Sequence, residues 1–239
     1  LNPYEMAVDV SYSRKLSEAF AMAVALRFIR SDMGASADED MVPDNAFAAD
    51  IAGYLEKYVV IGQSEALWSF GFNMSNIGTK VSYDGGNKNQ FLPTKLSLGT
   101  GLLYPLDDYN QIGVYLDLSK YLVPSAPVQT GSTPEEIEEY NKKYEDYNNM
   151  SPITGIFKSF GDSPNGFKGE LEEIMASIGV EYNYNEQFFV RGGYYYENKY
   201  QGNRQYFSVG AGFRMSVFQL DAAYLISTVQ SNPLDQTLR

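Results

Sequence analysis

The sequence predicts an all-β protein, an antiparallel transmembrane β-barrel of the outer-membrane type. The first observation is that apolar residues alternate with small or charged ones, which gives a strand one apolar face and one different face. The alternation is clear in Phe20, Met22, Val24, Leu26 and Phe28. The second observation is that tight turns alternate with long polar links, as the periplasmic turns and outer loops of such barrels do. A soluble sandwich would have no reason to keep this alternation of links.

Composition is compatible with that fold and excludes other classes. The chain has 239 residues, of which 44% are hydrophobic and 15% aromatic, and its mean hydropathy is −0.31. No run of about eighteen apolar residues occurs, so no transmembrane helix is expected. A barrel turns only every second residue toward lipid, so its mean hydropathy can be low. The net charge of −12 argues against a nucleic-acid partner, because phosphate binding needs clustered Lys and Arg.

About ten segments carry the period-two pattern, and their ends are set by clusters of turn-forming residues. Tight junctions are expected at residues 105–108, 184–186 and 215–217. Residues 56–66 depart from the alternation of tight turns and long links, because this link is too long for a place where a tight turn is expected. The longer links are residues 31–45, 78–93, 123–173 and 198–204. The expected strands are residues 5–12, 18–30, 46–55, 67–76, 94–104, 111–122, 174–184, 187–196, 205–215 and 218–227.

The face of these strands opposite the apolar one carries charges of both signs. A polar lumen would account for them, since the interior of such a barrel faces water. The alternative is the solvent-facing side of an ordinary antiparallel sheet. The residues that we expect to face the lumen are Arg27, Asp50, Asp117, Glu181, Arg191, Arg214 and Asp221.

One long loop, residues 123–173, carries the helix that we expect. Thr133 is a capping residue, Pro134 occupies the first helical position, and Glu136 lies three residues after the cap. If the short turns are periplasmic, this loop is extracellular. Exposed aromatic residues are common anchors of protein interfaces, although the loop could instead pack into the mouth of its own barrel. The candidate partner-binding residues are Ile137, Tyr140, Tyr144, Tyr147, Phe157, Phe160 and Phe167.

The chain offers little catalytic chemistry. It contains no histidine and no cysteine, which excludes a Ser-His-Asp triad and any metal site built on imidazole or thiolate within these residues. The acidic run at residues 38–40 lacks the ordered spacing of a calcium-binding loop, so a solvated loop is the better interpretation. We therefore expect no cofactor, no metal and no enzymatic activity.

Several stretches resemble the PorV family of type IX secretion outer-membrane proteins, which is similar to the FadL-like barrels of about fourteen strands. These stretches lie in loops as well as in strands, and together they cover essentially the whole chain. They are NIGTKVSYDGG at residues 76–86, FLPT at 91–94, LGT at 98–100, ALRFIRSD with its neighbours at 23–32, SPITGIF at 151–157, residues 197–203 and QSNPLDQTLR at 230–239.

The resemblance implies a location in the outer membrane of Bacteroidetes-type bacteria. It also implies a protein that binds the translocon barrel and the C-terminal signal domains of cargo, and passes cargo to the surface attachment complex. A FadL-like transporter of hydrophobic small molecules and a lipopolysaccharide deacylase remain the alternatives. We expect residues 1–239 to form a single barrel domain, embedded in outer-membrane lipid and incomplete at both ends.

Overall fold

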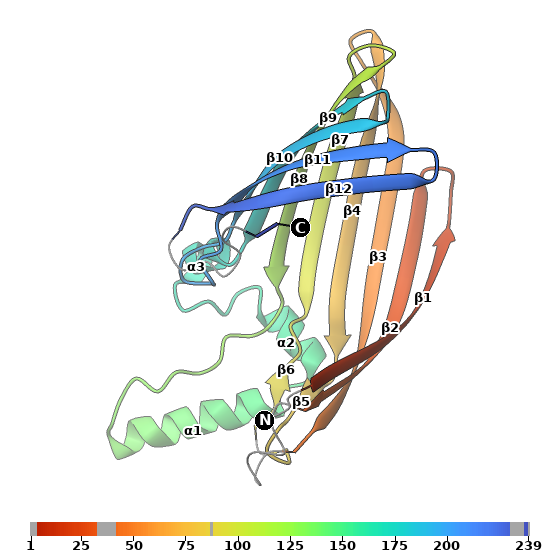
Figure 1. The fold of residues 1–239 in the computed structure, drawn as a ribbon. Helices are drawn as coiled ribbons and strands as arrows, with labels where there is room; N and C mark the ends of the chain where they lie inside the picture. The colour runs from red at the N-terminus through yellow and green to blue at the C-terminus, as the bar shows by residue number, and fades with distance from the viewer. Residues whose placement is uncertain (1–3, 33–41, 87, 230–236, 239) are drawn as a thin grey trace.

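Ten strands form one antiparallel sheet, and every neighbour in the sheet is the next long strand along the chain (Figure 1). The computed structural model describes residues 4–32, 42–86, 88–229 and 237–238. The all-β prediction is confirmed, and most strand ends lie within a few residues of those expected. The strands are β1 (Tyr4–Lys15), β2 (Phe20–Asp32), β3 (Asp44–Ile61), β4 (Ser64–Gly78), β7 (Lys95–Pro105), β8 (Asn110–Tyr121), β9 (Met175–Tyr184), β10 (Phe188–Tyr196), β11 (Tyr206–Met215) and β12 (Phe218–Ser227).

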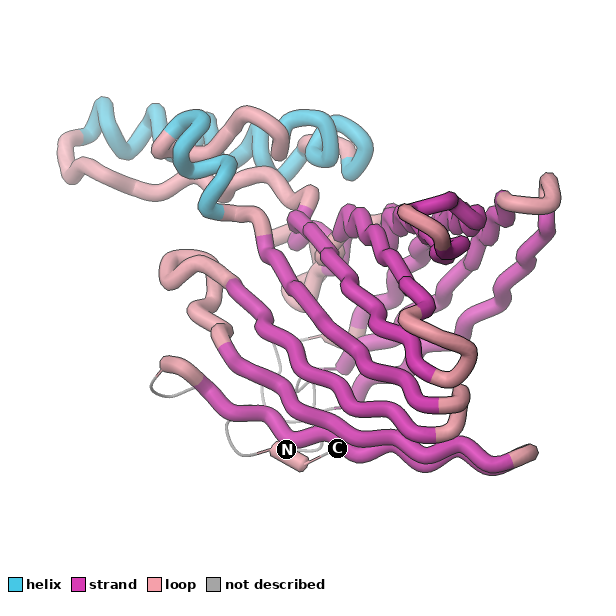
Figure 2. The backbone as a smooth tube through the Cα atoms, turned by 90° about the horizontal axis from the view of Figure 1, so that it is seen from above, coloured by secondary structure: helices cyan, strands magenta, loops and turns pink. Residues whose placement is uncertain are grey.

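Viewed from above, the sheet bends into an open trough, with the helices gathered at the end of the long loops (Figure 2). Its outermost strands, β1 and β12, do not pair with each other in the described part of the chain. Near the free edge of β12, Tyr224 forms a bridge with Leu238. None of the described helices is long and apolar enough to cross a membrane.

The expected link at residues 56–66 is wrong. β3 and β4 instead continue pairing to Ile61 and Ser64, and a two-residue turn with Gly62 at φ 66° joins them. A glycine is suited to that left-handed backbone conformation. The tight turn that the alternation of links required is therefore present, at the tip of a hairpin longer than its neighbours.

A β-bulge interrupts the same pair of strands at its other end. Ala49 pairs with Ile77, whereas Ile51 pairs with Met74, so β4 has one extra residue there. Asn76 takes a left-handed conformation at the bulge, with φ 59°. Bulges of this kind re-aim side chains and bend a strand.

Two short strands, β5 (Lys80–Val81) and β6 (Gln90–Phe91), form a small hairpin in the loop after β4. This loop folds over the sheet, where Val81 and Leu92 pack with Ala46 and Ala48 of β3 in a buried cluster. The loop between β8 and β9, all of which the structure describes, contains three helices rather than the one expected, because two short helices follow the expected one. They are α1 (Pro134–Asn149), α2 (Pro152–Lys158) and α3 (Gly166–Glu172).

Candidate functional site

The registers between strands place all seven charged residues expected in the lumen on one face of the sheet. Arg191, for example, lies opposite Glu181. Asp221 lies opposite Gly212, which is two residues before Arg214 in β11 and therefore shares its face. Hollows in this face span from β3 to β8 and from β8 to β11, so it is the concave face of the trough. That the concave face lines a closed lumen stays a prediction.

Arg27 organises one cluster of charges on the concave face. Its Nε donates to Asp9 Oδ1 at 2.5 Å and its Nη2 donates to Asp50 Oδ2 at 3.2 Å. Its Nη1 donates to the Asn76 side chain at the bulge, and the Asn76 backbone N–H donates to Asp50 Oδ1 at 2.8 Å. Thr94 completes the cluster by donating from its hydroxyl to the Asn76 carbonyl at 2.7 Å. Four strands and the bulge are thereby held by one guanidinium and its partners.

Arg191 organises a second cluster, on β9 to β12. Its Nε donates to Glu181 Oε2 at 2.5 Å and its Nη1 donates to Asp221. Arg214 donates to Gln219 at 3.0 Å. The guanidinium groups of Arg191 and Arg214 also lie 5.0 and 5.1 Å from the centre of the Phe189 ring, within cation–π range. Of the four carboxylates among the seven expected residues, only Asp117 has no cation among its described partners. It accepts a long hydrogen bond of 3.5 Å from Ser177.

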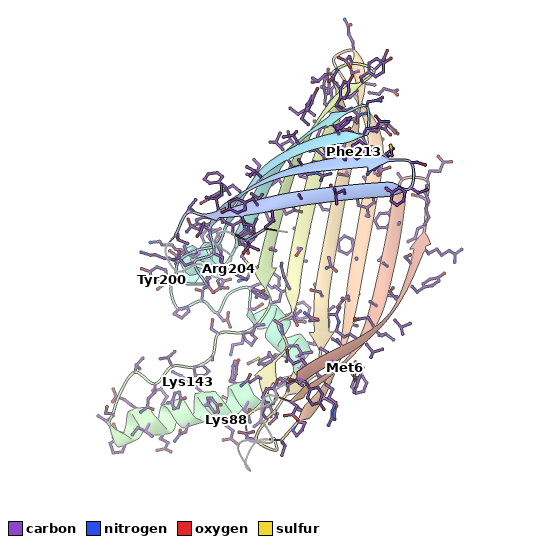
Figure 3. The ribbon with its side chains drawn as sticks, viewed as in Figure 1. Met6, Lys88, Lys143, Tyr200, Arg204 and Phe213 are labelled. Atoms are coloured by element: carbon purple, nitrogen blue, oxygen red, sulfur yellow. The ribbon has the colours of Figure 1, made fainter. Side chains whose placement is uncertain are left out.

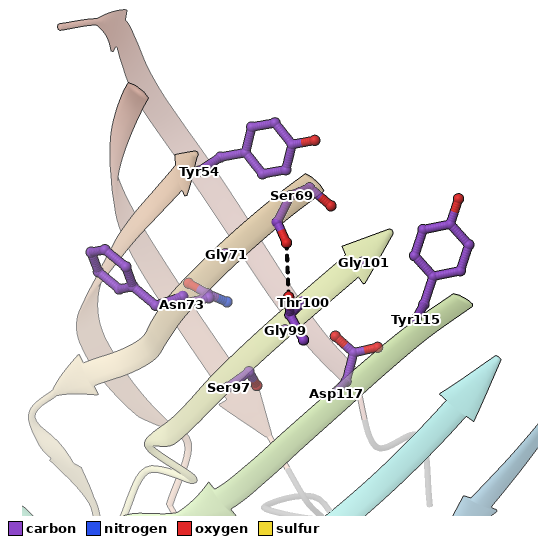
Figure 4. Close-up of a pocket in the computed structure, with 11 residues that line it drawn as sticks. Tyr54, Ser69, Gly71, Asn73, Ser97, Gly99, Thr100, Gly101, Tyr115 and Asp117 are labelled. Atoms are coloured by element: carbon purple, nitrogen blue, oxygen red, sulfur yellow. Dashed lines mark hydrogen bonds between the residues drawn. The ribbon is translucent and has the colours of Figure 1, made fainter. Parts of the chain in front are cut away.

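Sequence reasoning missed a strip of glycines on the concave face. Figure 4 shows it between Tyr54 and Tyr115, where a hollow of about 300 Å³ lies over Gly71, Gly99 and Gly101. A Cβ atom at Gly101 would come within 2.5 Å of Tyr115 Cδ1. The lack of a side chain at Gly101 therefore leaves room for the Tyr115 ring. The available signal was glycine at positions two residues apart in one strand, as at Gly99 and Gly101.

The predicted helix α1 is confirmed, together with its capping box. Thr133 accepts a hydrogen bond from the Glu136 backbone at 3.3 Å, and the Glu136 side chain accepts one from the Thr133 backbone at 3.0 Å. The Thr133 hydroxyl also donates to Glu136 Oε2 at 2.7 Å, and this bond, together with that from the Thr133 backbone, holds the pKa of the Glu136 carboxyl below its ordinary value. The helix extends away from the sheet, and Lys143 on it has no strand beside it (Figure 3).

The opposite end of α1 is fastened to the β5–β6 hairpin. Lys80 Nζ donates to the carbonyls of Tyr147 and Asn148 at 3.1 and 3.0 Å. The same ammonium lies 4.0 Å from the centre of the Phe91 ring, and burial lowers the pKa of Lys80. A cation at the carbonyl end of a helix also interacts favourably with the helix dipole.

The seven candidate partner-binding residues do not form one surface. Tyr140, Tyr144 and Tyr147 follow one another along α1, with ring centres 6.0 and 6.5 Å apart. Ile137 lies one turn before them on the same face. Phe157 belongs to α2 and remains exposed.

Phe160 and Phe167 lie apart from these residues, against the convex face of the sheet. With Leu96, Leu98 and Leu118 they line a groove of about 320 Å³ against the apolar face of β7 and β8. Lys120 Nζ fixes α3 there through Glu170, at 3.0 Å, and through Glu173. Sequence spacing could not separate these phenylalanines from the tyrosines, because the separation depends on how the loop folds back on the sheet.

A comparison with known protein families identifies the family to which this chain belongs. The sequence profile named PorV, type IX secretion system protein PorV, matches residues 1–128, which is more than half of the chain. The chain belongs to the PorV family. A search of curated proteins gave no match.

Membership of the PorV family gives this protein a role in type IX secretion, with partners in that system. The family and the β-rich fold are consistent with an outer-membrane location. The matched residues cover β1 to β8 and end in the extended segment before α1. The acidic run at residues 38–40 lies outside the described residues.

Proposed function

We propose that this PorV-family protein is a non-enzymatic outer-membrane β-barrel that binds the C-terminal signal domains of cargo and the translocon barrel, and carries cargo to the surface attachment complex. The barrel would be FadL-like, with residues 1–239 supplying a single domain. The concave face would line the lumen, and residues 123–173 would form an extracellular loop. The family match supports neither the transporter nor the deacylase alternative.

The two faces of the sheet support the membrane orientation. The convex face presents exposed apolar rows, such as Val8 and Val10 on β1 and Val209 on β11. Arg27 and Arg191 are paired with carboxylates on the concave face. Lipid contact suits the first face and water suits the second. In this arrangement the end with the short turns would face the periplasm and the end with the helices would be extracellular.

The single observation that carries the partner-binding role is the placement of α1. It is fastened at its last turn to the β5–β6 hairpin through Lys80, while its other turns extend beyond the sheet. No residue of α1 is buried, although it carries Ile137 and three tyrosines on one face. The hairpin loop, rather than α1, packs over the concave face. A projecting helix with an aromatic stripe fits a protein partner better than a plug.

Deletion of residues 133–150 tests this role. We expect the variant to reach the outer membrane at normal levels, because the deletion removes no strand of the sheet. Co-purification of the translocon barrel and of cargo signal domains should fall about tenfold or more, since the main anchors are lost. Quantitative pulldown from membranes, normalised to the amount of barrel, is the measurement.

A matched pair of point variants separates the aromatic stripe from the helix itself. Tyr140→Ser with Tyr144→Ser removes two of the three tyrosines of the stripe, whereas Glu138→Ser with Lys142→Ser alters the opposite side of α1. Only the first pair should weaken co-purification. If partners were retained equally by the deletion and by both pairs, α1 would not be a docking element.

A further inference from the structure

The β3–β4 hairpin extends past the β1–β2 hairpin at the short-turn end of the sheet (Figure 1). The ladder between β2 and β3 ends at the pair Phe20 and Leu55, followed by one bond from the Glu56 N–H to the Ala19 carbonyl at 2.8 Å. Pairing of β3 with β4 continues for five more residues, to Ile61. One edge of residues 57–61 therefore has no neighbouring strand among the described residues.

The direction of the backbone groups on this edge follows from the ladder. Successive residues of a strand turn their N–H and C=O groups to opposite sides. Because the Glu56 N–H points toward β2, those of Tyr58 and Val60 point the same way, while Lys57, Val59 and Ile61 bond toward β4. Tyr58 and Val60 therefore direct two donors and two acceptors away from the hairpin.

The side chains of these two residues are also exposed. Tyr58 is 66% exposed and Val60 is 74% exposed, and both lie on one face of the hairpin. Proteins usually protect such an edge with proline, a bulge or inward-pointing charge. Residues 57–61 contain no proline, their pairing with β4 has no bulge, and their one charged side chain, Lys57, lies on the opposite face.

We propose that this edge, formed by residues 57–61, binds an extended polypeptide segment of a partner protein as an added antiparallel strand. The surface itself specifies the occupant. Free N–H and C=O groups at alternate residues match the backbone of a strand, whereas a lipid chain or a helix offers no such row of partners. Apolar or β-branched side chains in the segment would face Tyr58 and Val60.

A second copy of this chain does not fit the edge. Antiparallel pairing of two β3 edges would turn the two sheets end for end, which two copies with the same orientation in one membrane cannot do. The partner is therefore a different segment, reached from the side of the short turns. The inference concerns the opposite end of the sheet from α1, so it can fail or succeed independently of cargo binding there.

The test uses the purified protein in detergent and a fluorescent octapeptide of alternating threonine and valine. We expect saturable binding and slower hydrogen exchange at the amides of Tyr58 and Val60 when the peptide is bound. A control octapeptide with proline at two central positions should not bind, because proline lacks the donor. Absence of binding, or binding without protection of these two amides, would overturn the proposal.

Two substitutions at one position separate the backbone from the side chain. Val60→Pro removes a donor that does not face β4, and should weaken peptide binding about tenfold. Val60→Thr keeps the donor and nearly the same shape, and should bind better than Val60→Pro. Unchanged exchange at Val59 and Ile61 would show that the hairpin is intact. Equal affinity of Val60→Pro and the unaltered protein would contradict the proposal.

Discussion

Several charged side chains in this protein pair with residues of other strands or across a loop. Glu197, directly after β10, illustrates this, since its side chain is only 2% exposed. It accepts hydrogen bonds from Arg204 Nε at 2.6 Å, from Arg204 Nη2 at 2.8 Å and from the Arg204 backbone at 3.2 Å. The pair closes the loop between β10 and β11. The Arg204 guanidinium holds the pKa of Glu197 below its ordinary value of 4.5.

This pair makes the loop sensitive to acid. A carboxyl with a depressed pKa in the folded state stabilises that state above its ordinary pKa, and the contribution is lost as pH falls through the depressed value. We expect a spin label at Gln201→Cys to be ordered at neutral pH and to become mobile as pH falls below 4.5. The chain has no other cysteine, so the label is site-specific. Electron paramagnetic resonance measures the change.

Glu197→Gln in the same labelled protein is the control. The amide cannot ionise, so the label should be more mobile than in the parent at neutral pH and should respond little to acid. A transition of equal size in both proteins would mean that another group controls the loop.

At the scale of elements, α1 forms from local signals but takes its position from contacts with the distant β5–β6 hairpin, among which Lys80 makes the charged ones. The capping box at Thr133 and the proline after it start the helix. Lys80, more than sixty residues earlier, donates to its last carbonyls. Hydrogen bonds from a charged donor contribute about 1.5–3 kcal/mol each. The hairpin that carries Lys80 therefore sets the direction in which α1 projects.

Replacing Lys80 should loosen α1 without unfolding the sheet. Lys80→Ala removes the donor to Tyr147 and Asn148, so we expect a broader distribution of distances between spin labels at Glu138→Cys and Asp108→Cys. Double electron–electron resonance gives that distribution. Lys88→Ala, an exposed lysine near the same hairpin, should leave it unchanged. Equal breadth in the Lys80→Ala and Lys88→Ala proteins would mean that the hairpin does not anchor the helix.

For the whole molecule, the contrast between the two faces of the sheet is the organising property. Leu26, near the middle of β2, is 68% exposed on the convex face. Its neighbour Ala25 lies on the concave face, opposite Asp50 in the ladder. If the sheet spans the membrane, a charge at position 26 would contact lipid, whereas a charge at position 25 would lie beside the Asp50 carboxylate.

The same substitution at both positions tests that asymmetry. Arginine on the lipid face of a barrel costs about 2–4 kcal/mol at the bilayer midplane. We therefore expect Leu26→Arg to lower the free energy of unfolding in lipid vesicles by that amount, and Ala25→Arg to have a much smaller effect. Reversible denaturant unfolding monitored by Trp68 fluorescence provides the measurement. Similar losses for both variants would argue against lipid on the convex face.

The sequence by itself determined the strands, their two faces, helix α1 and the family resemblance. Each of these is local, because period-two alternation and a capping box depend on residues only a few positions apart. The shared face of Arg27 and Arg191 also follows from alternation within each strand, carried across the sheet by regular pairing.

Only the tertiary structure decided how far β3 and β4 pair, where the bulge lies and how the aromatic residues of the long loop divide. The bulge depends on Asp50 bonding to Asn76, which are 26 residues apart. Phe160 and Phe167 lie apart from the tyrosines of α1 because they line a groove against β7 and β8. Such contacts join distant parts of the chain, and the free energy that selects them comes from packing and pairing that no local pattern records.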